Sequence, residues 1–276
     1  MKNKVKKIVL FFNMNRGIKV YEKLKSSYNI KIVIAKKYLD KKILTYLNKN
    51  KIPFILIKNL NDKRINFLND TDLAIACGFP LIFKNRLLNK TKYGFINCHA
   101  GKLPEYRGGS PLHWQLINGE NHFWISVLRI DAGLDTGNLI EQKKFLIKDN
   151  YNITHLQNIA DNNFPNLILK SIKKIEKGQK FKAQDKKKYK LWPQRYPLNS
   201  FVDFSAKDNH EVLRLLRACI KPYEAFTFIK GKKLKIIKAV LIKRNFPIGV
   251  ITKVREKRYI GCREGSILLK KSNFEC

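Results

Sequence analysis

Three polar side chains near the middle of the chain have the chemistry that acyl transfer to an amine requires. Asn97 and His99 flank a single residue, and Asp135 follows in the segment Asp-Ala-Gly-Leu-Asp-Thr-Gly at residues 131–137. An asparagine amide can donate a hydrogen bond to an oxyanion, and a histidine can exchange protons near neutral pH. A neighbouring carboxylate can orient the histidine ring and favour its charged form. We therefore predict that Asn97, His99 and Asp135 form the catalytic group of an acyl-transfer site.

The elements that must position these residues follow an α/β pattern. Strand-like and helix-like segments alternate through the first half of the chain, which predicts a Rossmann-like, mostly parallel sheet covered on both faces. No Gly-x-Gly-x-x-Gly motif follows the first strand, so a nicotinamide dinucleotide is not expected. The predicted strands cover residues 6–13, 30–35, 53–57, 72–76 and 93–98, and the predicted helices cover residues 18–24, 41–47 and 84–88.

A glycine-rich loop at residues 101–109 is expected to lie across the carboxyl edge of this sheet, where α/β proteins bind ligands. Ser110 and Pro111 predict the start of a helix, because serine caps free amides and proline has a fixed φ that suits the first helical position. Gly119 is placed to end that helix. Further along, the pattern predicts strands at residues 122–131 and 139–147 on either side of Asp135, and a helix at residues 153–177 that Pro165 would bend or divide.

The last third of the chain reads as a separate small domain. Residues 179–200 are basic and irregular, which predicts a linker between a catalytic domain at residues 1–178 and a second domain at residues 201–276. A small β-barrel of the OB type would accommodate the elements expected there. These are a helix at residues 209–219 and strands at residues 225–229, 233–242, 248–254 and 266–270.

The motifs around the three polar residues resemble those of the N10-formyltetrahydrofolate-dependent formyltransferases. That family has an Asn-x-His motif, then a Leu-Pro-x-(Tyr/Trp)-Arg-Gly loop, then a Leu-Asp-x-Gly motif. This chain has all three in the same order, at residues 97–99, 103–108 and 134–137. A single Asn, His or Asp at a strand end is more often a satisfied polar group than a catalyst, but here all three occur together with the loop. The resemblance implies the formyltransferase fold and the catalytic roles of Asn97, His99 and Asp135.

The same resemblance implies a site for the co-substrate N10-formyltetrahydrofolate. The pterin would lie against apolar side chains and backbone of two segments, and the loop at residues 101–104 would lie beside the reacting carbon. The five cysteines have no metal-ligand spacing, so no metal is expected. The implied cofactor-binding residues are Pro80, Leu81, Phe83, Leu88, Gly101, Lys102, Leu103, Pro104, Asp131, Ala132 and Leu134.

Composition leaves the amine acceptor open. The chain has 57 Lys and Arg residues against 21 Asp and Glu residues, which gives a formal net charge of +36. Such a charge favours the binding of a polyanion such as tRNA. Lysine far outnumbers arginine, the excess is spread over the chain, and Ile and Asn are also abundant. An A/T-rich coding sequence would produce the same bias, so charge alone does not identify the acceptor.

The sequence therefore leaves three hypotheses for the function. Gly101 and Lys102 replace the Ser-Leu that is usual in methionyl-tRNA formyltransferases, and the segment at residues 35–43 leaves little room for the extended basic loop of that branch. The segment at residues 221–228 also resembles enzymes that formylate nucleotide-linked amino sugars. We favour such an amino sugar, a 4-amino-4-deoxyhexose above all. The alternatives are initiator Met-tRNA as acceptor and an inactive, RNA-binding relative.

The location of the protein follows from its apolar segments. No apolar run approaches the roughly 20 residues that a membrane span needs. The apolar segment near the start has only the length of a strand and is followed by no small-residue cleavage site. We expect a cytoplasmic protein without a membrane partner, and the sequence leaves a homodimer open.

Overall fold

The computed structural model describes residues 4–185, 187–220 and 223–275. The described chain divides into two compact units, each of which is built from several segments. The first unit consists of Met1–Pro111, Trp124–Phe145 and Gln157–Leu191, and the second consists of Leu112–Phe123, Leu146–Leu156 and Trp192–Cys276.

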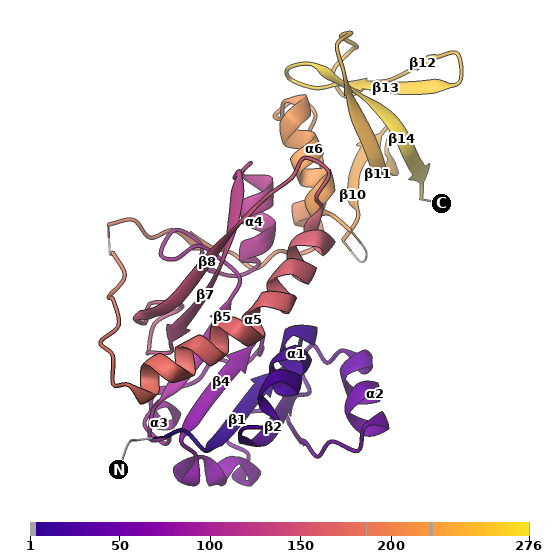
Figure 1. The fold of residues 1–276 in the computed structure, drawn as a ribbon. Helices are drawn as coiled ribbons and strands as arrows, with labels where there is room; N and C mark the ends of the chain where they lie inside the picture. Colours follow the sequence, from indigo (N-terminus) through magenta and orange to yellow (C-terminus); the bar gives the residue numbers. More distant parts are fainter. Residues whose placement is uncertain (1–3, 186, 221–222, 276) are drawn as a thin grey trace. The chain divides into compact units, whose positions relative to one another are not determined.

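A seven-stranded sheet forms the centre of the first unit, with the strand order β3-β2-β1-β4-β5-β7-β8 (Figure 1). Strands β1 to β5 pair in parallel, whereas β7 runs antiparallel to β5. The predicted α/β class with a mostly parallel sheet is therefore confirmed. The strands are β1 (Lys7–Phe12), β2 (Asn29–Ala35), β3 (Ile55–Ile57), β4 (Leu73–Cys77), β5 (Phe95–His99), β7 (His122–Arg129) and β8 (Leu139–Leu146).

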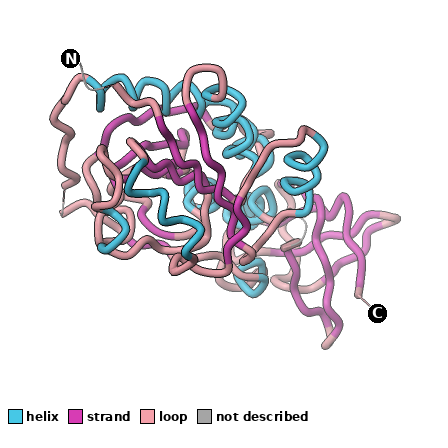
Figure 2. The backbone as a smooth tube through the Cα atoms, turned by 90° about the horizontal axis from the view of Figure 1, so that it is seen from below, coloured by secondary structure: helices cyan, strands magenta, loops and turns pink. Residues whose placement is uncertain are grey.

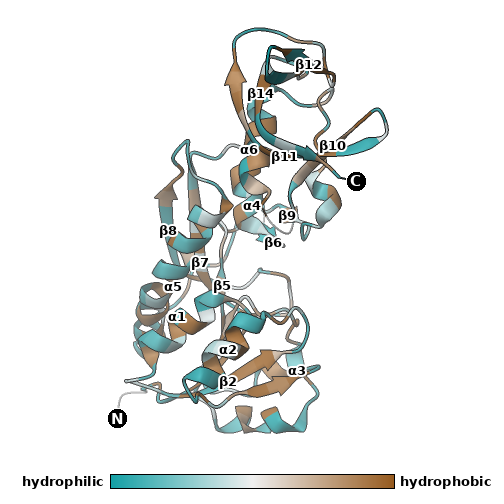
Figure 3. Ribbon diagram, turned by 90° about the vertical axis from the view of Figure 1, so that its right-hand side faces the viewer, coloured by the Kyte–Doolittle hydropathy of each residue, from teal (hydrophilic) through white to brown (hydrophobic). Residues whose placement is uncertain are grey.

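Both faces of the sheet are buried, which is why its central strands are almost continuously apolar. Val9 and Phe11 of β1 belong to the apolar cluster on one face, and Phe12 points to the other face, where α1 passes at Gly17. Figure 2 shows helical segments on both sides of the strands, and Figure 3 shows the strands as the apolar part of this unit. The helices of this unit are α1 (Asn15–Leu24), α2 (Lys41–Lys49), the 3-10 helix η1 (Lys63–Asp70), α3 (Asn85–Leu88) and most of α5 (Ile153–Glu176). Helix α4 (Pro111–Ile117) belongs to the second unit except for Pro111.

Two details of the first unit differ from the sequence predictions. Pro165 does not divide α5, which continues from Ile153 to Glu176. The short strands β6 (Arg107–Gly108) and β9 (Leu191–Trp192) were not predicted, because a segment of two residues carries no periodicity. The predicted domain limits at residues 178 and 201 stay a prediction.

The second unit contains a five-stranded antiparallel sheet with the order β10-β11-β14-β13-β12. Apolar residues of α6, among them Val212 and Leu215, pack with Leu234 and Ile267 of the sheet in one buried cluster. The pairing makes β10 and β12 the ends of the sheet, so closure into the expected OB-type barrel stays a prediction. The elements are η2 (Pro197–Ser200), α6 (Asn209–Ala218), β10 (Ala225–Ile229), β11 (Lys232–Ile242), β12 (Ile251–Val254), β13 (Lys257–Gly261) and β14 (Ser266–Phe274).

Strand β13 was missed in the sequence. It pairs with β12 through a tight turn in which Val254 lies opposite Lys257, and Arg255 adopts a left-handed φ of 51°. Such turns usually carry Gly or Asn, and neither is present to mark this one. Among the residues that the structure describes, no helix has the length and apolar character to cross a membrane.

Candidate active site

Asn97 and His99 lie on the same face of β5, at its carboxyl end. Residues two apart on a strand share a face, so the intervening Cys98 points the other way. Its Sγ atom lies 3.2 Å from Sγ of Cys77 on the neighbouring strand, and both side chains are buried. Burial raises the pKa of the Cys77 thiol well above its ordinary value. Cys98 is therefore a core residue, as the strand pattern predicts, and the open face of β5 carries Asn97 and His99.

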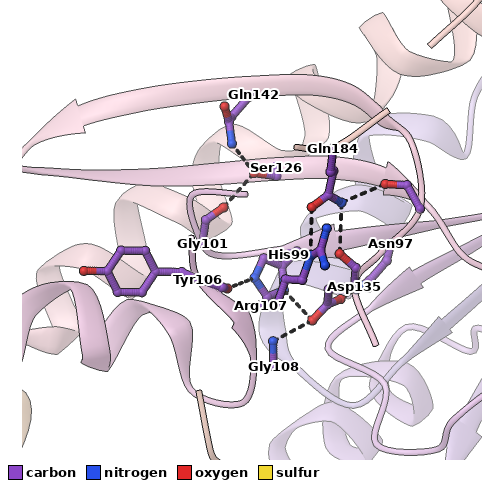
Figure 4. Close-up of polar contacts among 11 residues, drawn as sticks. Asn97, His99, Gly101, Tyr106, Arg107, Gly108, Ser126, Asp135, Gln142 and Gln184 are labelled. Carbon is purple, nitrogen blue, oxygen red and sulfur yellow. Dashed lines mark hydrogen bonds and ion pairs between the residues drawn. The ribbon is translucent and has the colours of Figure 1, made fainter. Parts of the chain in front are cut away.

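The carboxylate of Asp135 joins these two residues (Figure 4). Its Oδ1 accepts a hydrogen bond from Asn97 Nδ2 at 3.2 Å. Its Oδ2 lies 3.3 Å from His99 Nδ1 and accepts a second hydrogen bond from the Gly108 amide at 3.0 Å. Only 5% of the His99 side chain and 9% of the Asp135 side chain are exposed. The structure thus brings the three predicted catalytic residues together in one largely buried cluster.

Both ring nitrogens of His99 face acceptors. Nδ1 faces the Asp135 carboxylate, and Nε2 lies 2.6 Å from the carbonyl oxygen of Tyr106. A neutral imidazole has a single N–H and can donate to one of them, whereas the doubly protonated ring can donate to both. These two contacts fix the orientation of the ring from two sides.

The loop after β5 approaches the histidine ring closely, and Gly101 permits this approach. A Cβ atom at Gly101 would lie 2.7 Å from His99 Nε2 and 2.9 Å from the Tyr106 carbonyl oxygen, both too close for any side chain. The Gly101 carbonyl accepts a hydrogen bond of 2.6 Å from the fully buried hydroxyl of Ser126 on β7. Gln142 of β8 donates to the same hydroxyl at 3.0 Å. Two strands of the sheet thereby anchor the loop that shapes the histidine pocket.

A pocket of about 130 Å³ lies beside Asn97 and Asp135. Its walls are largely apolar, with an aromatic side that includes Phe79 and Phe83. The rings of Phe79 and Phe83 stack on each other with centroids 5.6 Å apart, which fixes the shape of this wall. An apolar pocket with a few convergent polar groups is the usual form of a small-molecule site.

The predicted folate contacts divide into three groups. Leu81, Phe83, Asp131 and Leu134 line the pocket. The loop residues Gly101, Lys102, Leu103 and Pro104 are outside the pocket lining. Gly101 approaches His99, Lys102 forms an ion pair with Glu105 at 2.9 Å, and Leu103 is buried. Among the described residues, Pro80, Leu88 and Ala132 are outside the pocket lining, and Leu88 packs against the core of the first unit.

Several residues that shape the site were not predicted. Phe79, Ile82, Arg129 and Ile130 also line the pocket. Their apolar or basic side chains are typical of ordinary core or surface positions, so the sequence contains no signal that marks them. Asp131 has a second role, since its Oδ1 accepts hydrogen bonds from the Gly133 amide at 3.1 Å and the Thr136 hydroxyl at 2.5 Å and so shapes the loop that carries Asp135.

Arg107 and Gln184 support the site from outside the pocket. The Arg107 guanidinium is buried, lies over the ring of Tyr189 at 5.2 Å and donates to Gln184 Oε1 at 3.0 Å. These contacts hold Arg107 between Tyr189 and Gln184. Within the described part of the chain, no group of three or more His, Cys, Asp or Glu side chains is arranged to hold a metal ion.

Two family models match the chain. Residues 6–172 match the formyl transferase model, and residues 196–276 match the model of the formyl transferase C-terminal domain. The first of these ranges contains all three residues of the polar cluster.

Curated relatives with sequence similarity are methionyl-tRNA formyltransferases. The protein of Thermodesulfovibrio yellowstonii is 30% identical over 203 residues, which cover 74% of this chain and 65% of the relative. That of Clostridium beijerinckii is 31% identical over 236 residues, which cover 82% of this chain and 75% of the relative. The chain thus spans only 65% to 75% of the length of these two relatives.

Solved structures with a similar fold include both kinds of enzyme. A sugar 3N-formyltransferase solved with dTDP and 5-N-formyl-THF has a TM-score of 0.73 at 20% identity, with 98% of this chain and 100% of that chain covered. The N-formyltransferase of Helicobacter canadensis, in complex with folinic acid and dTDP-3-aminofucose, has a TM-score of 0.73 at 21% identity, with 96% and 98% covered. The methionyl-tRNA formyltransferase of Clostridium thermocellum has a TM-score of 0.60 at 17% identity, with 86% and 94% covered. From its motifs, its fold and the two matched models, this chain belongs to the formyl transferase family.

Proposed function

We propose that the protein transfers a formyl group from N10-formyltetrahydrofolate to a primary amine, with Asn97, His99 and Asp135 as its catalytic residues. The observation that supports this proposal is that Asn97 and His99 both contact the Asp135 carboxylate beside an apolar pocket. Membership of the formyl transferase family and the folate compounds named with two similar structures support the choice of donor.

The residues around the pocket fit a folate. A flat heterocycle with polar edges needs apolar walls and a few hydrogen-bonding groups, and the pocket offers Leu81, Phe83 and Leu134 together with the polar groups of Asn97 and Asp131. The loop at residues 101–104 would lie next to the reacting end, because it touches His99. When bound, the folate supplies a formyl carbon, and attack of an amine at this carbon places negative charge on the formyl oxygen.

Asn97 and His99 would stabilise that charge. The Asn97 amide carries two hydrogens and donates one of them to Asp135, so the other can serve an oxyanion. The His99 ring, which contacts Asp135 and the Tyr106 carbonyl, would act beside it as the second group of the same site. One preorganised oxyanion donor is typically worth about 3 to 4 kcal/mol of transition-state stabilisation.

Asp135 would act as the proton carrier. The attacking amine must lose a proton, and the departing nitrogen must gain one. Asp135 is the carboxylate of the cluster, and its contacts with Asn97, His99 and the Gly108 amide hold it at the pocket. We propose that it accepts the proton from the amine and that ordered water assists its return to the leaving nitrogen.

A nucleotide-linked amino sugar is the acceptor that we favour. The sugar 3N-formyltransferase and the Helicobacter canadensis N-formyltransferase each have a TM-score of 0.73, against 0.60 for the methionyl-tRNA formyltransferase of Clostridium thermocellum. In addition, β2 ends at Ala35 and α2 begins at Lys41, so this connection has no room for an extended basic loop. The second candidate is initiator Met-tRNA, which the identity to curated methionyl-tRNA formyltransferases and the net charge of +36 favour.

The test is a formyl-transfer assay with N10-formyltetrahydrofolate and two sets of acceptors. One set is a panel of nucleotide-linked 3-amino and 4-amino sugars, and the other is charged initiator tRNA, with Asp135→Asn as the negative control for each. We expect turnover with at least one amino sugar and none with the tRNA. Turnover of the tRNA alone would replace the acceptor and keep the reaction. Salt-dependent RNA binding without turnover of any amine would instead favour the inactive, RNA-binding reading.

A further inference from the structure

Residues 182–185 and 187–190 lie beside the loops that carry the catalytic cluster. Lys182 bridges to Leu139, and the backbone of Lys190 exchanges hydrogen bonds with Arg107 and Pro104, at 3.2 and 3.4 Å. All of these residues belong to the first unit. The segment also lies between the two ranges that the family models match, residues 6–172 and 196–276. The two family matches therefore do not cover this segment or its contacts with the site.

Gln184 makes the most direct of these contacts. Its Nε2 donates to the backbone carbonyl of Asp135 at 2.9 Å and to that of Gly137 at 2.7 Å. Its Oε1 accepts the hydrogen bond from Arg107 Nε at 3.0 Å. Figure 4 shows the Gln184 amide between the Arg107 side chain and the Asp135 loop. All the polar atoms of this amide are therefore engaged with the catalytic loop or with the loop before it.

The backbone of Asp135 needs such support. Asp135 has a φ of 54°, in the left-handed region that residues with a Cβ atom rarely occupy. Two residues later, Gly137 passes so close to the Arg129 carbonyl that a Cβ atom there would lie 2.0 Å from its oxygen. Gln184 holds the carbonyls of these two residues, and a strained conformation persists only where its surroundings fix it.

We propose that Gln184 is a positioning residue for the reaction. By holding the Asp135 backbone, it places the carboxylate where Asn97, His99 and the Gly108 amide reach it together. The inference rests on the proposed function, because it assigns to Gln184 an effect on formyl transfer that passes through Asp135. A carboxamide suits this place because its nitrogen donates to the Asp135 and Gly137 carbonyls while its oxygen accepts from Arg107. An ionised glutamate side chain cannot donate these hydrogen bonds, and a methionine side chain has no N–H or O–H to donate.

The test compares Gln184→Met and Gln184→Glu with Asp185→Asn, a matched control at the next residue, whose exposed carboxylate accepts from the Lys187 amide and lies 3.9 Å from Lys188 Nζ. We expect kcat to fall at least tenfold in both Gln184 variants, with the KM for each substrate within about twofold of the wild-type value. Asp185→Asn should keep both constants. A kcat near the wild-type value in both Gln184 variants would overturn the inference.

A double variant distinguishes positioning from general destabilisation. If Gln184 acts through Asp135, then Gln184→Met should slow the Asp135→Asn enzyme no further, because residues that act as a unit are not additive. Losses that multiply in the double variant would contradict the proposal.

Hydrogen exchange adds a readout that does not depend on activity. Amides at residues 131–138 should exchange faster in Gln184→Met than in the wild type or in Asp185→Asn, because the loop loses two of its hydrogen bonds. Unchanged exchange would refute the structural half of the inference. A wild-type protein without formyl transfer overturns the proposed function, whereas an active wild type with an unimpaired Gln184→Met variant overturns this inference alone.

Discussion

The Oδ2 atom of Asp135 accepts a hydrogen bond from the backbone amide of Gly108 at 3.0 Å. Gly108 belongs to the Leu-Pro-Glu-Tyr-Arg-Gly loop, so this bond connects that loop to the Leu-Asp-Thr-Gly motif that contains Asp135. A carboxylate that accepts from a backbone amide, an asparagine and a histidine has little freedom to turn.

Replacing the carboxylate of Asp135 or the imidazole of His99 should strongly reduce turnover and leave the fold intact. We expect Asp135→Asn and His99→Ala each to lower kcat by about 10²- to 10⁴-fold, the usual contribution of a positioned acid or base. Steady-state kinetics measure the loss, and circular dichroism checks the fold. His155→Ala is a matched control, because His155 is exposed and its side chain contacts Asn152 and Tyr151. Near-normal rates in either cluster variant would refute the proposed roles.

The buried hydroxyl of Ser126 should contribute to stability through the loop that it anchors. Ser126→Ala leaves the Gly101 carbonyl and the Gln142 amide without this partner, and a buried unsatisfied polar group costs about 1 to 3 kcal/mol. Ser171 is equally buried but donates only to the Leu167 carbonyl of its own helix. We therefore expect Ser171→Ala to lower the free energy of unfolding by less. Denaturant unfolding of both variants tests this, and equal losses would mean that the Ser126 contacts add nothing.

A buried ion pair joins α1 and α5. Arg16 Nε lies 3.2 Å from Asp161 Oδ1, with side chains only 7% and 11% exposed, and the guanidinium also lies over the Phe164 ring. Burial raises the pKa of Asp161, against the opposing charge of Arg16. Asp161→Asn leaves the arginine charge buried and unpaired, which should lower the free energy of unfolding by about 3 to 5 kcal/mol.

The exposed pair of Lys7 and Asp70 serves as the control for this prediction. Its atoms are 2.7 Å apart, yet the side chains are 50% and 80% exposed. Because water screens such pairs, Asp70→Asn should cost less than about 1 kcal/mol. If chemical denaturation gives both variants the same stability, burial does not determine the strength of these ion pairs.

His113 should make the stability of the protein depend on pH. Burial, and secondarily the charge of Arg195, lowers the pKa of His113 from 6.5 to about 4 in the folded state. Between pH 6.5 and 4 the unfolded chain therefore binds a proton at His113 that the folded chain does not bind. The contribution of His113 to the free energy of unfolding is complete above pH 6.5 and is lost as the pH falls toward 4. The shift corresponds to roughly 3 kcal/mol. His113→Gln should remove this part of the slope in urea midpoints measured across that range, and an unchanged slope would count against a buried neutral histidine.

Local patterns in the sequence predicted most of the secondary structure of the first unit. The strands around Val9 and Ile34 are continuous apolar runs because the sheet is buried on both faces, and Ser110 with Pro111 marks the start of α4. Such signals involve residues that are neighbours along the chain, so they can be recognised from the sequence alone. Strand β13 escaped because its turn at Arg255 lacks the residues that usually mark it.

The sequence by itself determined which chemistry is present: an amide, an imidazole and a carboxylate in a motif order that resembles the formyltransferases. The tertiary structure decided how these groups meet. Asn97 and Asp135 are 38 positions apart, and Gln184 is 49 positions from the carbonyl that it holds. No local propensity encodes contacts at such separations, because they form only when the sheet, the 101–109 loop and residues 182–185 and 187–190 pack against one another. The apolar pocket and the support given by Gln184 therefore became visible only in the folded chain.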